Sequence, residues 1–288
     1  MKNIFFIAGL LAIVFISCQK EDPIPYIPKD DTEKEKVPEP ISYEYDDFIT
    51  AGERMVYNVD ESGASVLDGD TIKENALWSF SVLTGTYTDT LEAMMPLLDP
   101  NGSDFPEATL AVVENKMKAF FAYSSKEKVE VLGVADTMMG QRTSIPFSNT
   151  MKFASFPIKF GAEFEDIVRA QVTQPYDTSI IIFGFPVAVD SIRYTMMTEV
   201  ISSFNAWGRI VLNADTIPCL REARQEIRTA DLEIHTTLGW FPSGTSTDEK
   251  VLIYNFYARE FGLPVAEVTM DMEKNISKVR YLKEYTGY

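Results

Sequence analysis

Short runs rich in Val, Ile, Thr, Phe and Tyr recur along this chain between residues 76 and 283, and turn-forming Gly, Asn, Asp and Pro residues separate them. Runs of this length and composition are typical of β-strands. Helix-length patterns do not alternate with them, which argues against parallel βαβ units. The pattern therefore predicts an all-β fold, either an antiparallel β-sandwich or a lipocalin-like half-barrel, with room for one or two short helices.

The clearest single strand is expected at residues 191–202. Ile192 and Val200 fall on one face of it, and Arg193 and Glu199 fall on the other. This period of two predicts a strand with one buried face. Further strands are expected at residues 76–84, 109–113, 119–123, 128–134, 167–173, 232–241, 251–257, 263–271 and 276–283. Residues 180–189 form an apolar run that is broken at Gly184 and Pro186.

Residues 203–228 are expected to form a hairpin with a wide turn at residues 213–215, where Asn, Ala and Asp interrupt two apolar runs. The spacing of Cys219, Ala223 and Ile227 in the second arm also fits one stripe of a helix. The turn before this arm and the strands around it favour a strand instead. The residues expected to shape the hairpin are Trp207, Gly208, Pro218, Leu220 and Arg221.

The first 17 residues have the parts of a bacterial signal peptide, namely a positive charge at Lys2, an apolar run over residues 4–16 and a cleavage site. That site, Phe-Ile-Ser-Cys, resembles the lipobox of bacterial lipoproteins, although Phe15 stands where Leu is usual. The resemblance implies that Cys18 is diacylated and becomes the new N-terminus. An anchor with more than one acyl chain holds a protein stably on a membrane.

A charged, proline-rich segment follows the expected anchor and extends over residues 18–45. Its Lys20, Glu21 and Asp22 resemble the surface-export signal of Bacteroidetes lipoproteins. The segment has too few aliphatic residues to form a core, so we expect an extended tether. Residues 46–288 contain no second linker of this kind and are expected to form a single β-rich domain.

Four stretches of the expected domain resemble motifs of uncharacterised secreted and surface proteins of Bacteroidetes. Residues 155–161 are similar to their yPxxyG motif, and residues 207–221 are similar to their GxGxhxxP…LR hairpin, apart from its turn. Residues 78–80 match their W-x-F motif, and residues 262–268 match their closing strand. The resemblance implies a shared β-fold and no particular activity.

The sequence offers little for catalysis or metal binding. With Cys18 lipidated, Cys219 is the remaining thiol and His235 the single histidine, so neither a zinc site nor a hydrolytic triad is expected. Cys219 is expected to be buried, and His235 to be structural or solvent-facing. Residues 99–104 carry oxygen atoms at a spacing that calcium loops use, but the Gly and Glu of such a loop are missing, which favours a polar turn. We therefore expect no catalytic residue, no metal and no cofactor.

These features lead to one main hypothesis, an outer-membrane lipoprotein exposed at the cell surface with a non-catalytic binding or structural role. Its expected partners are the membrane, through the anchor, and an unidentified extracellular protein, glycan or apolar ligand. The net charge of −17 argues against nucleic acid, which requires a basic surface. The methionine pairs at residues 94–95, 138–139 and 196–197 fit either core packing or the lining of an apolar cavity. The alternative is an extracellular glycan hydrolase that uses an Asp/Glu pair.

Overall fold

The computed structural model describes residues 39–62, 73–116, 118–138, 140–182, 184–212 and 215–287. These residues form an all-β protein with three short 3-10 helices, which confirms the predicted fold class. Cys18, Lys20, Glu21 and Asp22 lie outside the described residues, so their predicted roles stay predictions. None of the helices in the described part has the length and hydropathy needed to cross a bilayer.

The 3-10 helices are η1 (Tyr45–Asp47), η2 (Pro96–Leu98) and η3 (Gly102–Asp104). The strands are β1 (Arg54–Asp60), β2 (Lys73–Ser79), β3 (Tyr87–Met94), β4 (Leu110–Glu114), β5 (Lys118–Ser124), β6 (Lys128–Met138), β7 (Gln141–Ser155), β8 (Glu163–Ile182), β9 (Phe185–Leu212), β10 (Asp215–Thr236), β11 (Gly239–Tyr257), β12 (Ala266–Met270) and β13 (Ile276–Thr286).

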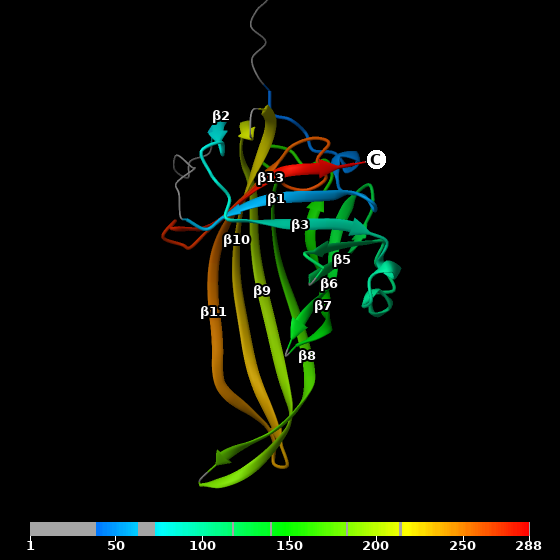
Figure 1. Cartoon of the computed structure of the whole chain (residues 1–288), viewed down its shortest axis with the longest axis vertical. Coiled ribbons are helices and arrows are strands. Elements are labelled where there is room, and N and C mark those ends of the chain that lie inside the picture. The colour runs from blue at the N-terminus through cyan, green and yellow to red at the C-terminus, as the bar shows by residue number, and fades with distance from the viewer. Residues whose placement is uncertain are drawn as a thin grey trace, which may run out of the picture. The chain divides into compact units, whose positions relative to one another are not determined.

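Twelve of the strands in the described residues close into an antiparallel barrel (Figure 1). The order runs β10-β11-β12-β13-β1-β3-β4-β5-β6-β7-β8-β9, and β9 pairs with β10 to complete the ring. The closed ring agrees with the lipocalin-like alternative and not with the sandwich. Closure pairs the strand edges over the part that all the strands share, whereas residues 171–182 of β8 and 239–251 of β11 have no ladder partner on β7 and β12 in the described residues. The remaining strand, β2, runs parallel to β9. It pairs with residues 206–211 of β9, which lie beyond the last residue of β9 that pairs with β8.

The four strands β8 to β11 are much longer than the other strands and continue beyond them (Figure 1). Ile182 pairs with Phe185, and Thr236 pairs with Gly239, so a tight hairpin connects each pair of long strands at the far end. The single strand expected at residues 232–241 is therefore wrong, because this segment contains a chain reversal. The break expected at Gly184 within residues 180–189 coincides with the reversal between β8 and β9.

A core rich in aromatic residues fills one end of the barrel. The ring of Phe256 contacts Trp78 at 5.1 Å and Phe80 at 5.5 Å between centroids, both in edge-on geometry. Tyr43 is fully buried, and its hydroxyl donates to the carbonyl oxygens of Asp47 and Gly262. The folded body thus includes residues before the expected boundary at residue 46, because a buried tyrosine holds them to it.

The predicted hairpin at residues 203–228 corresponds to the ends of β9 and β10. Leu212 pairs with Asp215, and residues 213 and 214 of the expected turn lie outside the described residues. Gly208 lies where β9 passes very close to β2, and a Cβ atom there would stand 2.1 Å from the carbonyl oxygen of Ala76. Only glycine permits this approach between the two backbones.

Candidate ligand-binding cavity

A cavity of about 670 Å³ lies inside the ring of strands. Pockets that hold small organic ligands have volumes of roughly 300–1,000 Å³, so this volume is sufficient for one such molecule. Side chains from β3 through β13 contribute to its lining. Its two sides differ sharply in chemistry, and we refer to them as the apolar wall and the charged wall.

The apolar wall is formed by β4 to β8. Inward-facing residues alternate with outward-facing ones along these strands, as expected for the interior of a barrel. In β6, for example, Val129 and Val131 line the cavity, and after the irregularity between Val131 and Gly133 the lining residue is Val134. The apolar residues of this wall are Leu110, Val112, Phe120, Ala122, Val129, Val131, Val134, Ile145, Phe147, Met151, Phe153, Val168 and Ala170, and Glu114, Lys118 and Arg169 line the cavity from the same strands.

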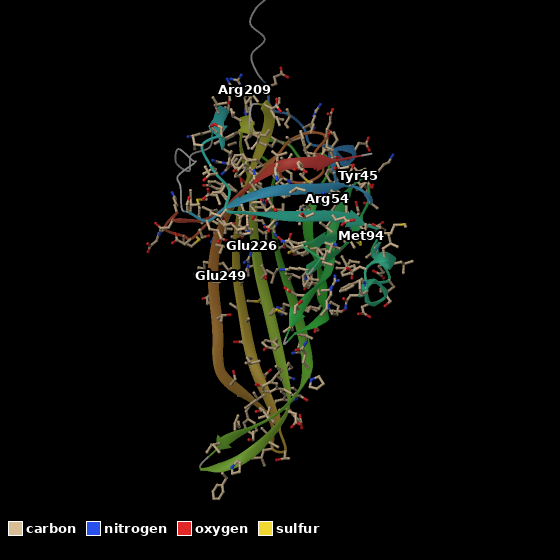
Figure 2. The ribbon with its side chains drawn as sticks, in the orientation of Figure 1. Tyr45, Arg54, Met94, Arg209, Glu226 and Glu249 are labelled. Carbon is tan, nitrogen blue, oxygen red and sulfur yellow. The ribbon has the colours of Figure 1, made fainter. Side chains whose placement is uncertain are left out.

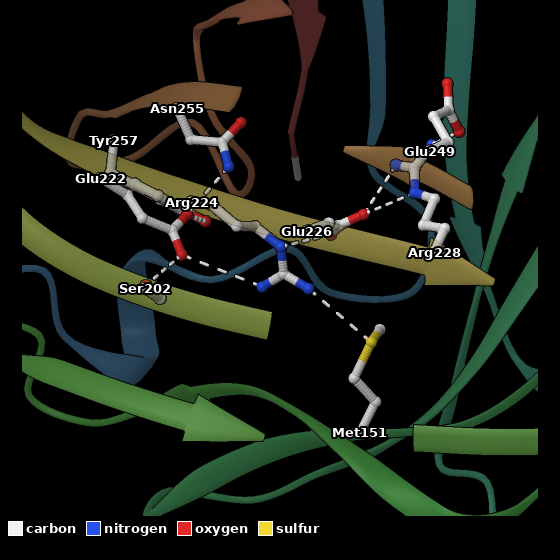
Figure 3. Close-up of polar contacts among 9 residues, drawn as sticks. All are labelled: Met151, Ser202, Glu222, Arg224, Glu226, Arg228, Glu249, Asn255 and Tyr257. Atoms are coloured by element: carbon white, nitrogen blue, oxygen red, sulfur yellow. Dashed lines mark hydrogen bonds and ion pairs between the residues drawn. The ribbon is translucent and has the colours of Figure 1, made fainter. Parts of the chain in front are cut away.

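The charged wall is formed mainly by β10, whose inward face carries four charges of alternating sign. Glu222, Arg224, Glu226 and Arg228 stand two residues apart, so the period of a strand directs all four toward the cavity. Figure 3 shows them in a row, and Figure 2 shows Glu226 and Glu249 on the neighbouring strands β10 and β11. Each charge therefore has an opposite charge beside it on the same strand.

Glu222 is almost completely buried and accepts hydrogen bonds from three side chains. Ser202 donates to its Oε1 at 2.5 Å, while Asn255 and Tyr257 donate to its Oε2 at 2.8 Å and 3.1 Å. Burial, followed by the nearby carboxylate of Glu222, raises the pKa of Tyr257 well above its usual value. Tyr257 therefore remains a neutral donor, and the carboxylate oxygens are satisfied as buried polar atoms must be.

Glu226 bridges two arginines on the same strand. The Nε of Arg224 donates to its Oε1 at 2.6 Å, and Arg228 donates to its Oε2 from Nε at 2.8 Å and from Nη2 at 2.6 Å. Burial would raise the pKa of Glu226, but the two guanidinium groups outweigh burial and hold that pKa below its usual value. Glu226 is therefore ionised at neutral pH. Arg228 continues the network to Glu249 at 3.3 Å.

A second ion cluster lies around Arg280 on β13. Its guanidinium donates to Glu267 at 2.7 Å and to Glu114 at 3.3 Å, and its carbon Cζ lies 4.9 Å from the ring centroid of Tyr57. Burial lowers the pKa of Arg280, but Glu267, Tyr57, Glu114 and Asp89 together outweigh this effect and the net shift is upward. As on β10, a buried guanidinium is paired with carboxylates.

A contact between Met151 and Arg224 joins the two walls across the cavity. Met151 on β7 points toward β10, and its sulfur lies 3.7 Å from Nη2 of Arg224 (Figure 3). Methionine is flexible and polarisable, so it can adapt to what lies beside it. The cavity can thus receive an apolar body against β4 to β8 while its polar end contacts a wall whose charges neutralise one another.

The residues expected to shape the hairpin lie outside this cavity. Trp207 pairs with Leu220, and Pro218 pairs with Arg209. Arg221 is fully buried, donates twice to Oδ1 of Asn205 at 2.8 Å and 3.1 Å, and lies over the ring of Tyr254 at 4.4 Å. These residues join β9, β10 and β11 at the end of the barrel that holds the aromatic core.

The remaining sequence candidates have structural environments. Cys219 is free and buried, and burial raises the pKa of its thiol far above its usual value. The Nδ1 of His235 lies 2.8 Å from Oδ1 of Asp190, and its ring packs on Trp240 at 4.9 Å. These environments agree with the buried and structural roles expected from the sequence.

The polar segment at residues 99–104 is organised by an arginine. Asp99 pairs with Arg142 at 2.5 Å, Asn101 donates to Ser144 at 2.8 Å, and Ser144 donates to Asp104. Its oxygens therefore bind side-chain donors. Within the described residues, no group of three or more His, Cys, Asp and Glu side chains is arranged to hold a metal ion.

Sequence reasoning missed the charged wall, although a signal was present. Glu222, Arg224, Glu226 and Arg228 alternate in sign at the period of a strand, and such a pattern can neutralise itself inside a barrel. A charged face of a strand is ordinarily solvated, whereas this one lines the cavity.

Comparisons with known proteins leave the family of this chain open. No family model matches it, and no curated protein matches it. Among solved structures, an exported protein with a YmcC-like fold from Bacteroides fragilis is similar over 86% of this chain and 100% of its own length. Its sequence identity is 12% and its TM-score is 0.35, so the likeness carries no inference about fold or function.

Proposed function

We propose that this protein is a lipid-anchored binding protein of the cell surface that holds an apolar ligand with an uncharged polar end inside its barrel. The observation that carries the proposal is the cavity of about 670 Å³ with one apolar wall and one charge-balanced wall. The predicted lipidation of Cys18 and the predicted export signal support a location on the outer membrane facing outward.

The chemistry of the charged wall supports binding over hydrolysis. A glycoside hydrolase needs one carboxylic acid that stays protonated near neutral pH and a second carboxylate beside it. Glu226 is ionised by its two arginines, and both oxygens of Glu222 are occupied by hydrogen bonds from Ser202, Asn255 and Tyr257. Neither group is placed to donate a proton to a substrate.

The apolar wall supports an apolar ligand over a glycan. Burial of apolar surface yields about 25 cal/mol per Å², so a hydrocarbon chain against β4 to β8 would supply most of the binding free energy. The charged wall would orient the ligand, because its paired charges attract the dipole of an uncharged polar end and favour neither anions nor cations.

A neutral fluorescent probe, N-phenyl-1-naphthylamine, tests this proposal on the Cys18→Ser chain. Thr198 on β9 lines the cavity, whereas the adjacent Met197 lies on the opposite face of the same strand. We expect Thr198→Trp to fill the cavity and weaken probe binding about tenfold or more, equivalent to about 1.4 kcal/mol. The matched variant Met197→Trp should bind as tightly as the parent chain. Equal binding by all three chains, or none by the parent, would reject the proposal.

A further inference from the structure

The strand ring has one weakly paired junction, between β7 and β8. In the described residues these strands share a single backbone pair, Phe147 with Ala170. By contrast, β8 pairs with β9 along nearly its whole length, and β9 pairs with β10 equally continuously. We call the facing segments, residues 147–152 of β7 and 166–170 of β8, the β7–β8 seam.

The β7 side of the seam is also loosely held by its other neighbour. The ladder between β6 and β7 joins Gly133 to Pro146 and then resumes at Val131 with Met151. In the described ladders, residues 147–150 therefore have no partner on β6, and of these four residues Phe147 alone has a partner on β8, Ala170. Such a bulge bends a strand and reduces the number of backbone bonds that must break for it to move.

Side chains replace the missing backbone bonds across the seam. Ser148 donates to the carbonyl oxygen of Arg169 at 3.0 Å, and Asn149 donates to that of Ile167 at 2.5 Å. The backbone N–H of Lys152 donates to the carboxylate of Asp166 at 2.6 Å. Ser148 and Asn149 are exposed, so water can take over these bonds if the strands separate.

The cavity lies directly behind the seam. Phe147 and Met151 on β7 line it, as do Val168 and Ala170 on β8. Arg169 both lines the cavity and is exposed to solvent, so the cavity reaches the surface at this junction. The seam is therefore a place where few backbone bonds separate the apolar wall from water.

We infer that the ligand passes between solvent and cavity sideways, through the β7–β8 seam, as residues 147–150 move away from β8. This inference rests on the proposed binding function. Opening there exposes Phe147 and Met151, which gives an apolar ligand a continuous apolar path. It leaves the charged wall on β10 and the ladders from β8 to β11 intact.

A reversible disulfide across the seam tests the inference on the full-length Cys18→Ser chain. Ser148→Cys combined with Arg169→Cys places two thiols on neighbouring strands beside the Phe147–Ala170 pair. Buried Cys219 does not compete, because burial raises the pKa of its thiol. We expect the oxidised variant to take up and release N-phenyl-1-naphthylamine about tenfold more slowly than the reduced variant, as for a closed lid. Addition of a reductant should restore both rates.

The matched control is Gln171→Cys combined with Thr195→Cys. These residues pair between β8 and β9, and their side chains lie 3.1 Å apart. This disulfide should leave both exchange rates unchanged. If the oxidised seam variant exchanges the probe as fast as its reduced form, the inference is wrong. If the parent chain binds no probe at all, the proposed function itself has failed.

A second variant keeps the inference testable if the seam disulfide does not form. Asn149→Ala removes one donor across the seam and leaves the cavity lining unchanged. We expect probe release to become several times faster while the dissociation constant stays constant. Gln171→Ala, which removes a side-chain bond between β8 and β9, should not alter release. Equal release rates for Asn149→Ala and the parent would overturn the inference.

Discussion

Individual residues in this protein resolve two physical conflicts. Gly208 removes a side chain where two backbones come too close for a Cβ atom. Glu226 is an ion in a buried position, which would cost several kcal/mol if it were alone, and Arg224 and Arg228 compensate that cost. Each case centres on one residue, Gly208 or Glu226, so each can be tested by one substitution.

Substitution of Gly208 should reduce stability. In Gly208→Ala the new methyl group collides with the carbonyl of Ala76, so β2 must move away from β9. Overpacking of this kind typically costs about 1–3 kcal/mol. Arg209→Ala at the exposed neighbouring position (Figure 2) should change the free energy of unfolding by no more than about 0.5 kcal/mol. Urea unfolding measures both values. Equal stabilities of the two variants would show that position 208 does not lie this close to the carbonyl of Ala76.

Glu226 should stabilise the fold at neutral pH and lose this effect in acid. Its pKa is lower in the folded protein than in the unfolded chain, where it is about 4.3. Its contribution is therefore complete above the unfolded pKa and disappears as the pH falls through the folded pKa. We expect the difference in unfolding free energy between the parent and Glu226→Gln to be largest at pH 7 and to shrink below pH 4. A difference that does not change with pH would show that the two arginines do not perturb Glu226.

At the scale of elements, the sequence predicted strands better than it predicted how they connect. Short runs of strand-forming residues bounded by turn residues located β4, β5 and β6 closely. The reversal at the end of β10 was missed, because strand-forming residues stand on both sides of it, as in the pair Ile234 and Phe241. The charged wall was missed because paired ions inside a barrel resemble a solvated strand face in sequence.

Backbone protection should differ between the seam and the long strands. Amides of residues 148–150 have no ladder partner in the described part, whereas residues 223–226 pair continuously with both β9 and β11. We expect hydrogen exchange, read by mass spectrometry of peptides, to be faster in the first segment by orders of magnitude. Comparable protection of the two segments would argue against an opening at this junction.

At the scale of the whole molecule, a closed barrel with a cavity is joined in sequence to an expected anchor. No two cysteines are available for a disulfide once Cys18 is lipidated, so the body depends on its core and its strand closure. Closure could not be read from the sequence, because it depends on the pairing of β9 with β10 around a ring that spans the body. The cavity follows from that closure.

The anchor makes a prediction of its own. Cys18→Ser removes the atom that would carry the acyl chains, so the protein should move from the membrane fraction to the soluble fraction of its host. Cys219→Ser provides the matched control, because its buried thiol has no part in anchoring. If the Cys18→Ser chain stays in the membrane fraction, the protein is not anchored through Cys18.

Native mass spectrometry of the Cys18→Ser chain, purified from its natural host, tests the central claim most directly. The account predicts a reproducible excess mass of a few hundred daltons, the size of one organic molecule that a pocket of this volume can hold. It also predicts that the excess is lost or reduced in Thr198→Trp and retained in Met197→Trp. A bare polypeptide mass for the parent chain, under conditions that preserve its fold, would contradict a ligand in the barrel.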